Sequence, residues 1–127
     1  MVDAVLAHAR RDHPDECCGI IAGKDGVATR LVPMANAERS PTGFVFDPAE
    51  WLTVYRSVDD DDEEFLAVYH SHTMTEAYPS RTDVRWAGTT EFLHWLLVST
   101  RSEDEEVRSF RIEDGVVVEE ELVVAGV

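Results

Sequence analysis

The sequence predicts a single domain of the α/β or mixed α+β class, with helices packed around one β-sheet. The chain has 127 residues, and 44% of them are hydrophobic, which suits one buried core rather than two domains. Short apolar runs of strand length recur along the chain, separated by segments with helical spacing or helix-capping residues. Strands mixed with a few helices are typical of a layered fold. We therefore treat residues 1–127 as one domain.

An amphipathic helix and a β-hairpin are predicted for the start of the chain. Apolar residues recur at helical spacing from Val2 to Ala9, and the helix ends at His13-Pro14 because a residue before proline avoids the α region. The short apolar run from Cys18 to Ala22 predicts a buried strand. The turn at Lys24-Asp25-Gly26 connects it to a returning strand, Val27 to Val32.

A second helix is predicted after a polar loop and a short extended piece. Asp47 is a strong N-cap, since Pro48 follows at the first helical position and Glu50 stands three residues after the cap. We expect this helix to run to about Val58. The acidic run over residues 59–64 is expected to be a solvated loop.

The second half of the chain predicts a central strand, a short helix and further strands. The apolar run from Phe65 to Tyr69 leads into His70-Ser71-His72 and predicts the central strand. After a loop, Ser80 caps a short helix that runs to about Ala87, with Asp83 at the capping-box position. The remaining elements are a buried strand and a final hairpin, over residues 93–98, 107–112 and 116–124.

The charge of the chain is strongly acidic. Eleven Lys and Arg against 26 Asp and Glu give a formal net charge of −15. Such a surface repels phosphate backbones and anionic lipids, so we expect neither nucleic acid nor a membrane as a partner. No apolar run approaches the roughly 20 residues of a membrane span, and the N-terminus does not resemble a signal peptide. The adjacent Cys17 and Cys18 do not suit a disulfide, which favours a reducing cytoplasm.

The segment His70-Ser71-His72 carries the strongest chemical signal. Alternate residues of a strand face the same side, so His70 and His72 project together. Ser80 and Asp83 follow after a loop of seven residues and share one helix face. Two imidazoles and one carboxylate make three ligands, and three protein ligands plus a water is the arrangement of catalytic zinc.

Hydrolysis of an amide requires two further groups. A base must take a proton from water and pass it to the leaving amine, and a donor must stabilise the oxyanion. Ser80, at the start of the helix, is a natural donor. Glu16, just before the first strand, is the candidate base, although spacing alone does not select it from the many acids.

The pattern of Glu16, His70-Ser71-His72, Ser80 and Asp83 resembles the JAMM (MPN+) metalloprotease signature at every position of that signature. The similarity extends to the Mec-type branch over five segments, HPDECCGIIAG, PMANAERSPTGFVFDPAEW, VYHSHTMTEAYPSRTDV, LLVSTRS and RSFRIEDGVV. The resemblance implies a curved mixed β-sheet flanked by helices, similar to the fold of cytidine deaminases. It also implies one zinc ion on the two histidines and Asp83, with Glu16 as general acid/base and Ser80 as oxyanion stabiliser.

The Mec-type branch also implies a substrate. It is associated with the release of cysteine from the C-terminal Gly-Gly of a small ubiquitin-like sulfur-carrier protein, CysO, in cysteine biosynthesis. We expect a basic face of the carrier to meet the acidic surface. Thr73 stands where many JAMM enzymes carry proline, and the Mec-type branch tolerates this departure. Family members usually have a short strand before the first helix, whereas this sequence starts inside that helix. For self-association, we consider a homodimer.

Several alternatives stay open on the sequence alone. The leaving group is either free cysteine or a lysine side chain, as in deubiquitinase-like relatives. Two histidines and one carboxylate also form the facial triad of non-haem iron oxygenases, in which Glu16 and Ser80 would have no role. A non-catalytic MPN binding module would typically lose motif residues, and none is lost here. Arg81 and Arg85 either receive a substrate carboxylate or face solvent.

Overall fold

The structure is a computed structural model that describes residues 1–39, 43–90, 92 and 94–122. Within these residues no helix is long and apolar enough to cross a membrane. The described elements are, in chain order, α1 (Val2–Asp12), β1 (Cys18–Lys24), β2 (Val27–Met34), α2 (Pro48–Asp60), β3 (Glu64–His72), α3 (Arg81–Ala87), β4 (His94–Ser99), β5 (Glu106–Glu113) and β6 (Val116–Glu120). The predicted helices and strands are therefore present in the predicted order.

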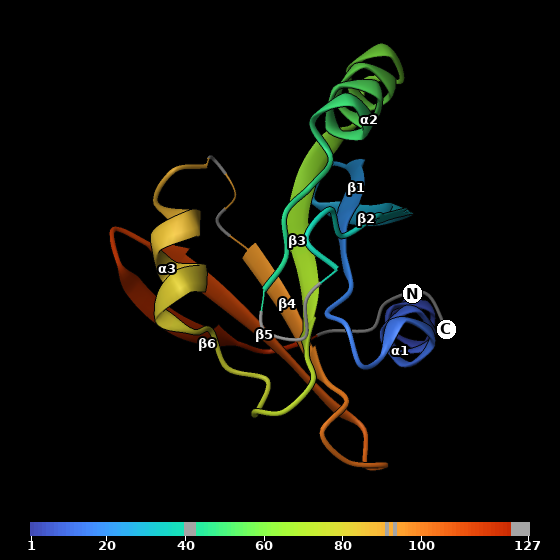
Figure 1. Ribbon diagram of the computed structural model, residues 1–127. Helices are drawn as coiled ribbons and strands as arrows, with labels where there is room; N and C mark the ends of the chain where they lie inside the picture. Colours follow the sequence, from blue (N-terminus) through green and yellow to red (C-terminus); the bar gives the residue numbers. More distant parts are fainter. Residues whose placement is uncertain (40–42, 91, 93, 123–127) are drawn as a thin grey trace.

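The strands form one mixed sheet in the order β2-β1-β3-β4-β5-β6. The pair β3 and β4 is parallel, and the other neighbouring strands are antiparallel. A parallel pair requires a crossover connection, and α3 lies in the segment that connects β3 to β4. Figure 1 shows β3 running through the middle of the molecule, which confirms the predicted central strand.

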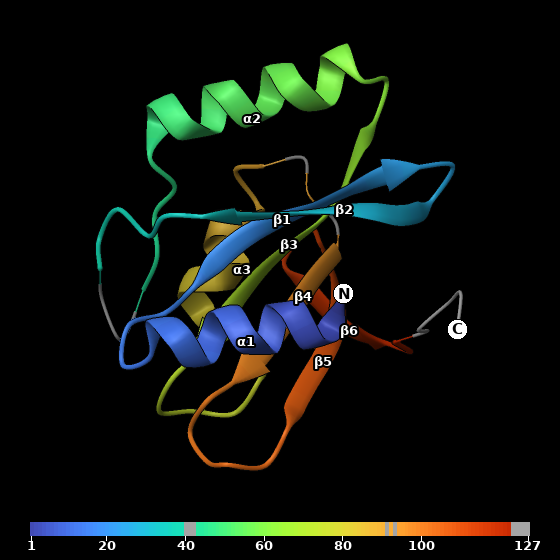
Figure 2. The ribbon, with the colours of Figure 1, turned by 90° about the vertical axis from the view of Figure 1, so that its right-hand side faces the viewer.

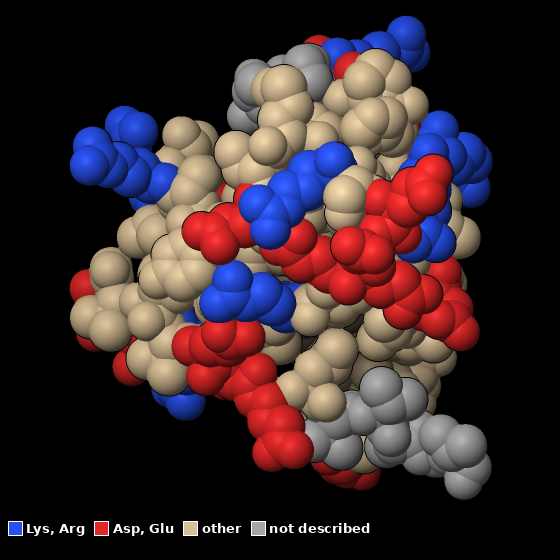
Figure 3. Space-filling model, turned by 90° about the horizontal axis from the view of Figure 1, so that it is seen from below, with Lys and Arg blue, Asp and Glu red and all other residues tan. Residues whose placement is uncertain are grey.

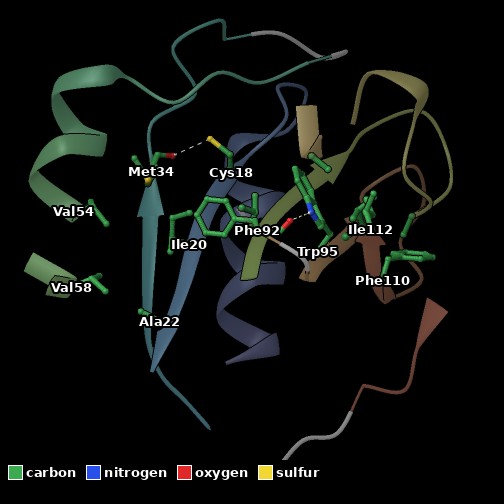
Figure 4. Close-up of a cluster of buried hydrophobic side chains, with 14 residues drawn as sticks. Cys18, Ile20, Ala22, Met34, Val54, Val58, Phe92, Trp95, Phe110 and Ile112 are labelled. Carbon is green, nitrogen blue, oxygen red and sulfur yellow. Dashed lines mark hydrogen bonds between the residues drawn. The ribbon is translucent and has the colours of Figure 1, made fainter. Parts of the chain in front are cut away.

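Helices cover both faces of the sheet. Figures 1 and 2 place α1 against one face and α3 against the other, with α2 across one end. Alternation along β3 divides its side chains, so that Tyr69 packs with Val5 and Leu6 of α1 while Val68 faces the opposite cluster. Figure 4 shows part of that opposite cluster, whose buried members include Cys18, Ile20, Ala22, Met34, Val54, Val58, Phe92, Trp95, Phe110 and Ile112.

The acidic run over residues 59–64 was predicted to be a loop, and this prediction is wrong at both ends. Helix α2 continues through Asp60, and β3 starts at Glu64. No glycine or proline interrupts the helix, and Val58, which is 1% exposed, anchors its last turn in the core. The chain turns instead at Asp62, whose φ of 54° lies in the left-handed region.

The predicted boundaries of the last strands also need correction. The final strand was predicted to reach Val124, but β6 ends at Glu120, where its pairing with Ser109 of β5 stops. Residues 123 and 124 lie outside the described residues. The predicted first residue of β4, Leu93, lies outside them as well, and the described strand begins at His94.

Both predicted helix caps are present, but they differ in kind. Asp47 accepts hydrogen bonds from two first-turn amides of α2. The carboxylate of Glu50 does not complete the expected capping box, because it accepts a hydrogen bond from the amide of Ala35 at 2.8 Å. At α3 the box is complete, since Ser80 and Asp83 each accept a hydrogen bond from the other's amide. This box links Ser80 and Asp83 rigidly at the start of α3.

Candidate metal centre and active site

The end of β3 and the start of α3 bring the three predicted ligands together. The Nε2 atoms of His70 and His72 lie 3.3 Å apart. Each lies 3.1 Å from Oδ2 of Asp83. All three residues are buried. Strand alternation aims both histidines to one side, and the capping box of α3 holds the carboxylate opposite them.

The donor set fits a tetrahedral metal ion. Metal–ligand bonds of about 2.0–2.1 Å in tetrahedral geometry separate the ligand atoms by roughly 3.3 Å, and the observed separations are 3.1 and 3.3 Å. Nδ1 of His72 donates to the carbonyl of Glu76 at 2.9 Å. In the neutral form of this ring, which is the form that binds a metal, the lone pair of Nε2 faces the Asp83 carboxylate, and a cation between them would offset their repulsion. Across the described part of the chain, no other such group could hold a metal.

The ionisation of Asp83 suits this task. Burial acts to raise the pKa of Asp83, but the charge and hydrogen bonds of His70, the hydrogen bond of His72 and the Ser80 amide hold it well below its usual range. Burial acts to lower the pKa of His72, but the hydrogen bonds to Asp83 and to the Glu76 carbonyl raise it overall. Asp83 is consequently a carboxylate at neutral pH, which is the form that binds a metal.

Aromatic packing holds His70 in place. The Phe44 ring stacks on the imidazole with centroids 4.7 Å apart and an interplanar angle of 30°. Trp95 meets the same ring edge-on at 5.9 Å. Nδ1 of His70 is buried and has no hydrogen-bond partner within the described residues, so packing orients this ring. Sequence reasoning assigned no role to Phe44; the apolar run 44–46 inside a polar loop was the available signal.

Glu16 lines the same hollow as the ligands His72 and Asp83. This hollow has a volume of about 210 Å³, and its lining includes Glu16, His72, Ser80 and Asp83. Glu16 is only 6% exposed. Burial raises the pKa of its carboxyl to about 7, with further upward contributions from Asp83 and Glu38 and a downward one from His72. A carboxyl with a pKa near neutrality can accept a proton and later return it.

Two side chains that sequence reasoning missed hold the backbone at Glu16. The hydroxyl of Ser71 accepts a hydrogen bond from the amide of Cys17 at 2.8 Å, and the Ser71 amide donates to the Cys17 carbonyl at 3.1 Å. Nδ2 of Asn36 donates to the carbonyls of Glu16 at 3.0 Å and Gly43 at 2.9 Å. Ser71 was recognised only as the residue between two histidines, and Asn36 only as the start of a loop.

Residues that were predicted to lie outside the centre do so. The other histidines contact side chains elsewhere, in the pairs His8 with Tyr69, His13 with Thr100 and His94 with Glu120. Cys17 and Cys18 are buried free thiols, and burial raises the pKa of both. Arg81 and Arg85 are exposed.

This fold and this site belong to a known class of protein. Residues 1–113 match the prokaryotic homologs of the JAB domain, and the chain belongs to that family. It is 55% identical over 123 residues to the CysO-cysteine peptidase of Mycobacterium tuberculosis. The matched region covers 94% of this chain and 84% of that relative. It is 29% identical over 116 residues to a probable TtuB-protein conjugate cleaving protease of Thermus thermophilus, covering 91% and 74%. The predicted relationship to JAMM-type metalloproteases is confirmed.

Solved structures share the fold. A protein from Desulfitobacterium hafniense superposes with a TM-score of 0.83 at 34% identity, covering 95% of this chain and 86% of that one. A JAB1/MPN domain protein from Archaeoglobus fulgidus superposes with a TM-score of 0.63 at 20% identity, covering 97% and 94%. The predicted mixed α/β fold, a sheet flanked by helices, is therefore confirmed.

Proposed function

We propose that this chain is a zinc metallopeptidase that cleaves the bond after the C-terminal Gly-Gly of a small ubiquitin-like sulfur-carrier protein and releases cysteine. One observation carries the proposal: a buried group of three ligands, His70, His72 and Asp83, adjoins a hollow that is also lined by a buried carboxyl with a raised pKa and by a helix-capping hydroxyl. The similarity to a CysO-cysteine peptidase supports cysteine as the leaving group.

His70, His72 and Asp83 are the proposed ligands of one zinc ion. Imidazole nitrogens and a carboxylate suit zinc, and three protein ligands leave a fourth position for water. When bound, zinc supplies Lewis acidity and lowers the pKa of water to about 7. The carbonyl of Glu76 holds the proton of His72 on Nδ1, so that Nε2 remains available as a ligand.

Glu16 is the proposed general base and acid. Its carboxylate takes a proton from the attacking water as the new C–O bond forms at the glycine carbonyl carbon. The same carboxyl then gives a proton to the amine nitrogen as the C–N bond breaks. Ser80 is the proposed oxyanion stabiliser, because its oxygen accepts from the Asp83 amide while its own O–H remains able to donate.

Ser80→Ala is expected to lower kcat by roughly 10²–10³-fold, the cost of losing one oxyanion donor. Steady-state kinetics on a carrier–cysteine adduct would measure the loss, with metal content checked in parallel. Ser80→Thr is the matched control, since it keeps both the hydroxyl and the helix cap and should recover most of the rate. An unchanged rate in Ser80→Ala would show that Ser80 caps the helix and does not stabilise the oxyanion.

The leaving group can be tested directly. A carrier–cysteine adduct and a lysine-linked carrier conjugate would each be incubated with the enzyme and weighed by mass spectrometry. We expect the first to lose one cysteine and the second to remain largely intact. Cleavage of the lysine-linked conjugate alone would overturn cysteine release and favour the second candidate function, protein-conjugate cleavage, which the Thermus thermophilus relative supports.

The iron oxygenase alternative fits the site less well. Asp83 lies on a helix beside a mixed sheet rather than in an all-β barrel, and Glu16 and Ser80 line the hollow where hydrolysis needs them. Metal analysis of the active protein, followed by chelation and reconstitution, distinguishes the two. Iron as the sole metal that restores activity would overturn the zinc assignment.

The acidic surface is proposed to steer the carrier. Figure 3 shows acidic side chains gathered in a band across one face, with a few basic side chains among them. The net charge of −15 attracts a basic partner at long range, and salt screens this attraction. We expect KM for the carrier to rise severalfold between 50 and 500 mM salt (about a threefold drop in Debye length) while kcat changes little. A KM that does not change with salt would show that the acidic surface does not steer the carrier and serves only solvation.

We further infer a cytoplasmic location, which the two unpaired cysteines support. The homodimer stays a prediction. Sedimentation equilibrium at micromolar concentration would measure it.

A further inference from the structure

The proposed reaction places an anion beside the scissile bond. A C-terminal cysteine carries its α-carboxylate two bonds from the leaving nitrogen, so this carboxylate lies within about 4 Å of the atom that Glu16 must protonate. The described residues that line the metal hollow include no lysine or arginine. The charges of Glu16 and Asp83 oppose an anion, and the proposed zinc ion offsets them on the side of its ligands. A lysine or arginine that pairs with the carboxylate must therefore lie outside this hollow.

A second hollow adjoins the first at Glu16. It has a volume of about 470 Å³, and Glu16 lines both hollows. The metal hollow is bounded by residues of α3, whereas the second hollow is bounded by α1 and by the segment that follows β2. Two arginines line it: Arg11 from α1 and Arg39 from the segment after β2. Glu16 thus stands between the metal ligands and a pair of cations.

The backbone at Arg39 is tied to the backbone at Glu16 through one residue. The Arg39 amide donates to the carbonyl of Asn36 at 3.1 Å, and Nδ2 of Asn36 donates to the carbonyl of Glu16 at 3.0 Å. Arg39 has a φ of 48°, a left-handed conformation that costs a non-glycine residue energy. This strained position persists because the surrounding hydrogen bonds hold it.

The side chain of Arg39 is available for a ligand. It is exposed, and within the described residues it has no ion-pair partner. Five of the ten arginines, namely Arg11, Arg30, Arg101, Arg108 and Arg111, are already paired with carboxylates.

The other charges around the second hollow favour Arg39 over Arg11 as the main contact. Nε of Arg11 already lies 3.6 Å from Asp12, which also pairs with His8 at 3.1 Å. Asp15 lines the same hollow and opposes an anion. Arg39 therefore offers a substrate carboxylate near Glu16 a guanidinium that is not already paired with another acid. A guanidinium can bind a carboxylate through two parallel hydrogen bonds.

We propose that Arg39, supported by Arg11, binds the α-carboxylate of the leaving amino acid in the second hollow. This inference rests on the proposed function and specifies its leaving group. A lysine side chain linked through its ε-nitrogen has no carboxylate at this distance. Arg39 is thus a specificity-determining residue that favours a C-terminal amino acid over a lysine-linked conjugate.

Two substrates that differ by one charge test the proposal: a carrier–cysteine adduct and the same adduct ending in cysteinamide. We expect the wild-type enzyme to cleave the acid with a kcat/KM about tenfold higher than the amide, as a charge-assisted contact near solvent predicts. Arg39→Gln should lose this preference by slowing cleavage of the acid, while its rate on the amide stays within twofold. Arg10→Gln, which changes a neighbouring exposed arginine of α1, is the matched control and should keep the preference.

The outcomes separate this inference from the proposed function. Equal cleavage of acid and amide by the wild-type enzyme would overturn the carboxylate site and leave the peptidase function standing, a result that does not depend on how any variant folds. A similar loss on both substrates in Arg39→Gln would also overturn it, since it would show a structural role. Cleavage of neither adduct by the zinc-loaded wild-type enzyme would overturn the proposed function, and the carboxylate site with it.

Discussion

Glu16→Gln is expected to lower kcat by about 10²–10⁴-fold while the protein keeps its metal. The substitution preserves the size of a buried side chain and removes its ability to exchange a proton at neutral pH. The proposed ligands are left in place, so ground-state binding of metal and carrier should change little. Steady-state kinetics on a carrier–cysteine adduct, combined with elemental analysis of the same preparation, measures both quantities.

Glu38→Gln is the matched control for this experiment. The Glu38 charge acts on the pKa of Glu16, but Glu38 is exposed and is not among the residues that line the metal hollow. Its neutralisation should change kcat at neutral pH by only a few-fold. A near wild-type rate in Glu16→Gln would show that Glu16 is not the base, and a loss of metal in that variant would give it a structural role instead.

His72→Ala is expected to abolish both metal retention and activity. It removes one of the three proposed ligands and the hydrogen bond to the Glu76 carbonyl, and it leaves the Asp83 carboxylate buried beside a single histidine. Loss of a residue that only orients a ligand typically costs 10–100-fold in metal affinity, so loss of the ligand itself should exceed about 100-fold. Zinc content after dialysis against a weak chelator measures this directly.

His94→Ala is the matched control, because this histidine is half-exposed and pairs with Glu120 away from the centre. It should keep zinc at full occupancy and activity near the wild-type value. Full zinc occupancy in His72→Ala would refute the assignment of His72 as a ligand. Since an empty metal centre can also lower stability, circular dichroism of the variant should accompany the metal analysis.

Local features of the chain predicted much of the fold. The caps at Asp47 and Ser80 are properties of a few adjacent residues, and both helices begin where these caps stand. The alternation of His70 and His72 follows from strand geometry alone. The end of α2 was misjudged because charge patterning suggested a loop from residue 59, whereas the helix continues through Asp60 and the chain turns only at Asp62.

The contacts made by the segment between β2 and α2 could not be predicted from local sequence patterns. Its sequence has no helical or strand period, and its described residues, 35–39 and 43–47, form only an isolated bridge between Asn36 and Phe46. No pattern therefore indicated that Phe44 stacks on His70 or that Asn36 holds Glu16. Each of these contacts joins residues distant in the chain. A sequence contains no local signal for such a contact unless it is compared with a relative.

The sequence by itself determined the kinds of residue at the site: two histidines on one strand face, a carboxylate and a hydroxyl joined by a helix cap, and a family signature that includes Glu16. Only the tertiary structure decided where these groups stand relative to one another. The pairing of β1 with β3 sets Cys18 opposite His70 and so brings Glu16 to the metal ligands. The tertiary structure also places Arg39 and Glu16 on the same hollow. Hydrogen bonds and burial act through space, and the register of a sheet can bring together residues that are far apart in the chain.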